Sequence, residues 1–182
     1  MDDDFSRLVS LACHDLRTPL ATVSGFTKTM LRINELGPDK QARYLGLIDD
    51  SAEELASLLD LLSLAARIEG GRYEPVVREA DSLALAPEGA TGTGVIVLVD
   101  PEPVETALAA FQRAASRHGG VEVTTAVDAQ RVSFEPVTEA AAPIVLGEDP
   151  KDLGAAVGVR LVRALGGELA LDGERLTVTL PS

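Results

Sequence analysis

The chain has 182 residues, of which 46% are hydrophobic but only 3% aromatic, and its formal net charge is −13. This length gives room for one ordinary domain or two small ones. The core must be aliphatic, because the chain contains no Trp. The negative charge argues against binding nucleic acid through a basic surface and against docking on anionic membranes.

Cysteine usage and hydropathy favour a cytoplasmic protein. The one cysteine, Cys13, rules out an internal disulfide and fits a reducing compartment; we expect it to be a small buried residue. No apolar run approaches the roughly 20 residues that span a bilayer. The first residues have neither the basic start nor the apolar stretch of a signal peptide. We therefore expect no membrane insertion.

Two long helices are expected in the first 71 residues. From Phe5 to Ile33 the apolar residues recur at alternating steps of four and three, a heptad seam typical of a helix that packs on other helices. A turn is expected at 34–39, around a Gly-Pro pair. The second helix carries two adjacent seams and should end at Gly70-Gly71, because glycine commonly stops helices.

The apolar faces of these helices are too wide for one hairpin to hide. Pairing two hairpins into a four-helix bundle would bury both seams, so we expect a homodimer. The alternative is that the rest of the chain covers the spare face.

The pattern changes after Gly71, where we place the boundary between a domain at 1–71 and a second at 72–182. Strands are expected at 95–99, 121–127, 131–134, 168–171 and 175–180, and helices at 101–117 and 153–165. Asp100 is placed to cap the first of these helices, and 87–94 is expected to be a loop. The fold class is therefore α+β, a helical hairpin followed by a small α/β sandwich.

The segment from His14 to Leu20, with sequence HDLRTPL, is the most informative in the chain. His14 lies two positions from the seam residues on either side, about 200° around the helix, so its ring should face solvent. A neutral imidazole is a competent nucleophile near neutral pH. Asp15 can fix its tautomer and support the positive charge of attack, and Thr18 shares its face one turn on. The alternative is that His14 is one more solvated polar residue.

This segment resembles the H-box of sensor histidine kinases, in their dimerisation and histidine-phosphotransfer domain. Residues 51–62 and 66–69 are similar to the X-box of the second helix in that family. The resemblance implies that His14 accepts the phosphoryl group, that Asp15 is its acid/base partner, and that Thr18 aids dephosphorylation of the response regulator. We expect the receiver domain of that regulator to dock on helix one at three further residues, Arg17, Leu20 and Ser24.

After residue 71 the chain resembles the catalytic ATP-binding domain of the family more weakly, because several motif residues of that domain are missing. Ala110 and Ala114 stand where the family has asparagines that hold magnesium and phosphates. The adenine-recognising Asp-x-Gly-x-Gly box is missing, and too few residues separate the strand at 131–134 from the next helix to form an ATP lid. Asp152 lies where a polyphosphate would sit, and its charge would repel one. The sequence thus predicts no bound cofactor or metal. His118 is expected to satisfy backbone carbonyls at a helix end.

These observations favour a bacterial phosphorelay protein that exchanges a phosphoryl group between His14 and response-regulator aspartates without ATP. Its Mg²⁺ would come with the receiver domain, and an upstream histidine kinase is a further expected partner. One alternative is a sensor kinase core that autophosphorylates His14. The other is a non-catalytic pseudokinase that regulates a response regulator or a kinase by binding it.

Overall fold

The computed structural model describes residues 3–33 and 36–181, and the chain divides into two compact units, Met1–Ser63 and Leu64–Ser182. The division falls inside the second helix, earlier than the boundary expected at Gly71. Part of the turn expected at 34–39 lies outside the described residues.

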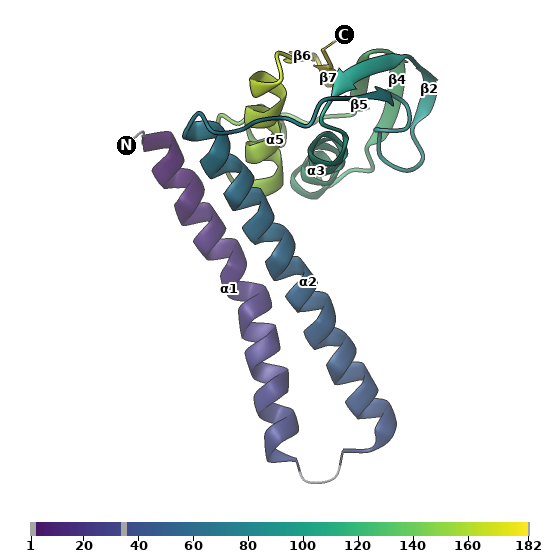
Figure 1. Ribbon diagram of the computed structural model, residues 1–182. Coiled ribbons are helices and arrows are strands. Elements are labelled where there is room, and N and C mark those ends of the chain that lie inside the picture. Colours follow the sequence, from purple (N-terminus) through teal and green to yellow (C-terminus); the bar gives the residue numbers. More distant parts are fainter. Residues whose placement is uncertain (1–2, 34–35, 182) are drawn as a thin grey trace. The chain divides into compact units, whose positions relative to one another are not determined.

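The first unit is the expected helical hairpin, in which α1 (Asp3–Arg32) runs beside α2 (Pro38–Glu69) (Figure 1). The rings of Phe26 and Tyr44 lie 5.0 Å apart and join the two helices. Large apolar side chains of the hairpin stay exposed, among them Leu31, Leu45 and Leu59. The hairpin therefore leaves part of its apolar surface in water.

The second unit is the expected α/β domain. Its elements are β1 (Arg78–Asp81), β2 (Thr91–Gly94), β3 (Ile96–Val99), α3 (Pro101–Gly119), β4 (Thr124–Ala129), β5 (Arg131–Glu135), α4 (Ala142–Val145), α5 (Leu153–Ala164), β6 (Glu168–Asp172) and β7 (Arg175–Thr179). Five strands form one sheet in the order β2-β4-β5-β7-β6, in which only the β2–β4 pair is parallel. Strands β1 and β3 form a separate antiparallel ribbon.

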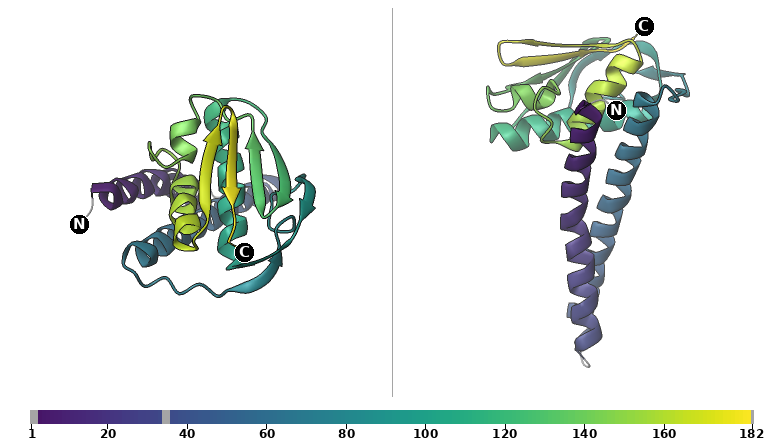
Figure 2. Two further views of the ribbon diagram at one scale, coloured as in Figure 1. Left: turned by 90° about the horizontal axis from the view of Figure 1, so that it is seen from above. Right: turned by 90° about the vertical axis from the view of Figure 1, so that its left-hand side faces the viewer.

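The core of this unit lies between the sheet and the two long helices. Along β4, β5 and β7 the residues alternate between buried and more exposed, the pattern of a sheet covered on one face. Helices α3 and α5 lie side by side across that face (Figure 2). The rings of Phe111 on α3 and Phe134 on β5 lie 6.3 Å apart at its centre, an aromatic contact that adds to the aliphatic burial.

Two glycines let α5 approach α3 closely. A Cβ at Gly154 would lie 2.8 Å from the Cβ of Ala110, and one at Gly158 would lie 3.0 Å from the Phe111 ring and 3.2 Å from the Cβ of Ala107. All three distances are below ordinary van der Waals contact. The small residues on the two helices therefore set their separation.

The strands and helices expected after residue 100 are present, with ends that differ by a few residues. The first strand of the 121–135 hairpin begins at Thr124 rather than Val121. The last hairpin turns through Gly173, which has φ +58°. The short helix α4 was not expected, because four residues are too few to show a helical period.

The expectation of a loop throughout 87–94 is wrong, because Thr91–Gly94 forms the edge strand β2. Its Thr-Gly repeat lacks the β-branched and aromatic alternation that marks a strand. Gly92, at φ +122°, lies so close to Val127 of β4 that no side chain would fit there. Pairing with β4, a tertiary contact, therefore makes this segment a strand. The ribbon strand β1 was also missed.

The expected capping role of Asp100 is wrong as well. Asp100 occupies the N-cap position of α3 in an extended conformation, but its side chain makes no capping hydrogen bond. Its Oδ2 instead accepts hydrogen bonds from the Tyr73 hydroxyl at 2.9 Å and from the Val76 N–H at 3.2 Å. Through these two hydrogen bonds the Asp100 carboxylate fixes the segment that follows α2.

Gly158→Val should destabilise the second unit by about 1–3 kcal/mol, because the added methyls would overpack the contact with Ala107 and Phe111. Urea unfolding followed by circular dichroism measures the change. Gly25→Ala on α1 is the matched control: a Cβ there meets no atom within 4 Å, so it should be neutral or stabilising by up to about 1 kcal/mol. Equal stability of the Gly158→Val protein would contradict the packing described above.

Candidate functional site

His14 projects from the solvent side of α1, as its distance from the apolar seam predicts. Its side chain is 77% exposed, and Nδ1 lies 3.2 Å from Oδ1 of Asp15, whose side chain is 30% exposed. When Nδ1 carries the proton it donates to this carboxylate, and Nε2 is left with a free lone pair. That tautomer suits attack by Nε2 on an electrophile approaching from solvent.

The other residues expected at this site lie on the turns after His14. Arg17 and Thr18 are exposed, Leu20 is 57% exposed, and Ser24 is half-buried. The exposed Leu20 is accessible for contact with a partner. The structure thus places these side chains along α1 with access to solvent, while their roles stay predictions.

The expectation that Cys13 is buried is wrong, since its thiol is exposed. Cys13 is one residue removed from His14, so it lies on the flank of α1 rather than on the apolar seam. Small size alone did not predict its burial.

In the second unit, the residues that the family resemblance places at a nucleotide site pack against each other. Ala110 and Ala114 are buried, and neither side chain carries an oxygen that could bind magnesium. The closeness of Gly154 to Ala110 leaves no gap between α3 and α5 at this point. These residues do not fit a magnesium–nucleotide complex held as the family resemblance implies.

Asp152 occupies the N-terminus of α5. Its Oδ1 accepts a hydrogen bond from the Ala155 N–H at 2.9 Å, so the side chain caps the helix and places negative charge at its positive end. Oδ2 lies 3.9 Å from Nε2 of His118. A phosphate group at this helix end would have to displace the carboxylate.

His118 does not make the contact expected of it. Its Nε2 is buried without a hydrogen-bond partner, near Asp152, rather than bonded to a backbone carbonyl. Beside it lies an open depression, lined by Gln112, Arg113, Ser116, Arg117 and Asp152. In the described part of the chain, no group of three or more His, Cys, Asp and Glu side chains could hold a metal ion.

Sequence reasoning missed the contacts that fix the segment after α2. Arg160 on α5 donates from Nε to Glu69 at 2.8 Å, and its side chain is only 10% exposed. The Arg67 guanidinium lies 5.7 Å from the centre of the Tyr73 ring. Burial and the hydrogen bond to Asp100 hold the pKa of Tyr73 well above its usual value. Glu69 and Arg160 are 91 positions apart, so no local pattern could pair them.

Residues 6–71 match the His Kinase A (phospho-acceptor) domain family. An uncharacterized sensor-like histidine kinase of Rhizobium meliloti is 32% identical over 88 residues, which are 46% of this chain and 17% of that protein. The probable sensor histidine kinase TcrY of Mycobacterium tuberculosis is 35% identical over 66 residues, 36% of this chain and 14% of that protein.

Solved histidine kinases share the fold of both units. The histidine kinase AdeS of Acinetobacter baumannii matches with a TM-score of 0.64 and 18% identity, over 92% of this chain and 97% of that chain. Full-length ShkA, solved in complex with AMPPNP, matches with a TM-score of 0.54 and 21% identity, over 97% of this chain and 45% of that chain.

The comparisons confirm the resemblance to sensor histidine kinases. The chain spans less than a fifth of the length of the two curated relatives it matches above. Within residues 3–33 and 36–181, no helix is long and apolar enough to cross a membrane.

Proposed function

We propose that the chain is a cytoplasmic histidine phosphotransferase that exchanges a phosphoryl group between His14 and the aspartates of response regulators, without ATP. The observation that carries the proposal is the contrast between the two units. The domain that matches the phospho-acceptor family keeps an exposed His14 in contact with Asp15, whereas the buried Ala110 and Ala114 stand where the family resemblance places the ligands for magnesium and phosphates.

Transfer begins when the phosphorylated aspartate of a receiver domain comes within reach of the imidazole. Nε2 of His14 attacks phosphorus and forms an N–P bond, while the bond between phosphorus and the aspartyl oxygen breaks and that oxygen leaves as a carboxylate. Asp15 accepts a hydrogen bond from Nδ1–H and stabilises the positive charge that develops on the ring. In the reverse direction, a second aspartate attacks and the neutral imidazole leaves.

The catalyst of such a transfer mainly has to align the donor, a magnesium ion and the ring. We propose that the magnesium arrives with the receiver. The receiver domain would dock on α1 at the exposed Arg17 and Leu20 and the half-buried Ser24. Thr18 would aid hydrolysis of the receiver's phosphate. An upstream histidine kinase would supply phosphoryl groups through such a receiver.

A kinase core that labels His14 from ATP remains the first alternative. Its supporting observation is the shared fold with ShkA, which was solved with AMPPNP. The second alternative is a pseudokinase that only binds its partner. Such a protein would not require His14, Asp15 and Thr18 together. Labelled ATP alone, followed by labelled phospho-receiver, separates the three functions.

His14→Gln should abolish transfer from a phospho-receiver and leave the fold intact, because the ring faces solvent. Asp15→Asn should slow transfer on the order of 10²-fold by removing the charge that supports the ring. Thr18→Ala should spare transfer and reduce hydrolysis of the receiver's phosphate. Phosphate-affinity gels measure all three.

The matched controls are His118→Gln, which changes the other histidine, and Thr27→Ala at an exposed threonine of α1. Both should transfer like the unmodified protein. If the His14→Gln protein still accepts label from a phospho-receiver, the proposal is wrong.

Mg²⁺–ATP should show no measurable binding by isothermal titration calorimetry, since the alanines of α3 supply no ligand atoms and the Asp152 carboxylate already caps α5. Incubation with labelled ATP alone should leave His14 unlabelled. Micromolar affinity, or ATP-dependent labelling that His14→Gln removes, would establish the kinase alternative instead.

The hairpin should form a homodimer through residues 5–68, because apolar residues such as Leu59, 54% exposed in a single chain, need cover. Leu59→Asp should therefore give monomers or unfolded protein in sedimentation equilibrium at micromolar concentration. Leu31→Asp, which changes an exposed leucine outside the seams, should leave the dimer intact. A compact monomer of the unmodified chain at that concentration would refute the four-helix bundle.

A further inference from the structure

The β1–β3 ribbon of the second unit presents apolar side chains to water. Ile96 and Leu98 on β3 are 61% and 50% exposed. Val76 and Val77, just before β1, are also exposed. Ile96 and Leu98 are neighbours on one strand, and exposed apolar side chains gathered on one surface are typical of sites that bind a partner.

The strand register shows that this surface is one face of the ribbon. Residues of β3 alternate between exposed and buried, with Val97 and Val99 turned into the core. Leu98 pairs with Glu79 of β1, and Ile96 pairs with Asp81. Directly paired residues of antiparallel strands share a face. The outer face therefore combines two large aliphatic side chains with two acidic residues.

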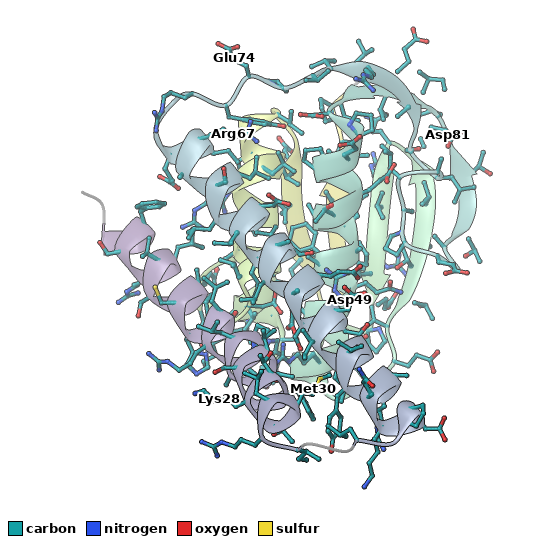
Figure 3. All side chains as sticks on the ribbon, turned by 60° about the horizontal axis from the view of Figure 1, so that its bottom comes forward. Lys28, Met30, Asp49, Arg67, Glu74 and Asp81 are labelled. Atoms are coloured by element: carbon teal, nitrogen blue, oxygen red, sulfur yellow. The ribbon has the colours of Figure 1, made fainter. Side chains whose placement is uncertain are left out.

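The surroundings of this face are acidic too. Exposed acids within residues 74–99 are Glu74, Glu79, Asp81 and Glu88, and the one base in that range is Arg78. Figure 3 shows Glu74 and Asp81 near opposite ends of the extended segment that enters the ribbon, with Glu74 pointing outward. A ligand for this face must therefore match apolar side chains at its centre and negative charge around them.

We propose that the outer face of the β1–β3 ribbon binds an amphipathic helix of a partner protein, apolar on one side and flanked by lysine or arginine. The proposal is independent of phosphotransfer at His14. It commits to a basic helix because complementary charge suppresses wrong partners and steers association.

A helix fits the spacing of the anchors. Side chains two positions apart on a strand, such as Ile96 and Leu98, lie roughly 6.6–6.8 Å apart along it. Apolar residues four positions apart on a helix are separated by about 6 Å along its axis. One apolar stripe of a helix can therefore lie between and over these side chains, and its basic flanks can reach Glu79 and the other acids.

The segment that joins the ribbon to the sheet offers no helix to cover this face, and a second copy of the ribbon offers no complementary charge. The segment 82–90, which joins the ribbon to the sheet, consists of turns and bends that form no helix. A second copy would bring the same acids against Glu79 and Asp81, and like charges facing each other are destabilising.

Fluorescence anisotropy with labelled 18-residue helical peptides tests the proposal on the full chain. A leucine–lysine peptide should bind at physiological salt, and a leucine–glutamate peptide should not. Ile96→Ser with Leu98→Ser should weaken binding by roughly tenfold or more, and Val121→Ser, at an exposed valine outside the ribbon, should leave it unchanged. Glu79→Lys should weaken the lysine peptide and improve the glutamate peptide.

The serine variants change exposed side chains, and their thermal unfolding should match that of the unmodified chain. Absent binding, or equal binding by the Ile96→Ser/Leu98→Ser protein, would overturn the proposal. So would equal affinity for the two peptides. A change of oligomeric state caused by the serine variants would assign the face to a second copy and would overturn it as well.

Discussion

Successive residues of an α-helix are rotated by about 100° around its axis. This rotation fixes which residues of α1 face solvent once its apolar residues face the neighbouring helix. Once the seam that includes Ala12 and Pro19 turns inward, His14 has to turn outward, and both outcomes are seen. The His14 ring therefore lies on the open surface of α1. Its Nδ1 contacts the carboxylate of Asp15 on the same helix.

The second unit follows a different constraint, the close contact of α3 with α5. Gly154 and Gly158 allow that contact, and Ala107 and Ala110 complete it from the other helix. The same small side chains that let the helices close on each other provide no ligand atoms. Asp152 adds a cap to α5 where an anion would otherwise find the helix end. The small residues therefore account for the close packing of the two helices, and the sandwich keeps its fold with alanines on α3.

The elements with a strong period were predictable from the sequence alone. Both hairpin helices, α3, α5 and the two β hairpins at the end of the chain appear where the apolar pattern put them. Exposure of His14 followed from its position relative to the seam, and Asp152 was expected at the start of α5. Elements without a period were missed or misjudged: β2 depends on Gly92 fitting against β4, and β1 exists only as the partner of β3.

The sequence by itself determined the helical hairpin and the place of the HDLRTPL segment on it, because these depend on residue type and local spacing. Only the tertiary structure decided that Asp100 bonds Tyr73 rather than its own helix, and that Glu69 meets Arg160. It also decided that one face of the β1–β3 ribbon stays open to solvent. These contacts join residues far apart in the chain, and a hydrogen bond or a buried face depends on which groups the fold brings together rather than on the residues beside them.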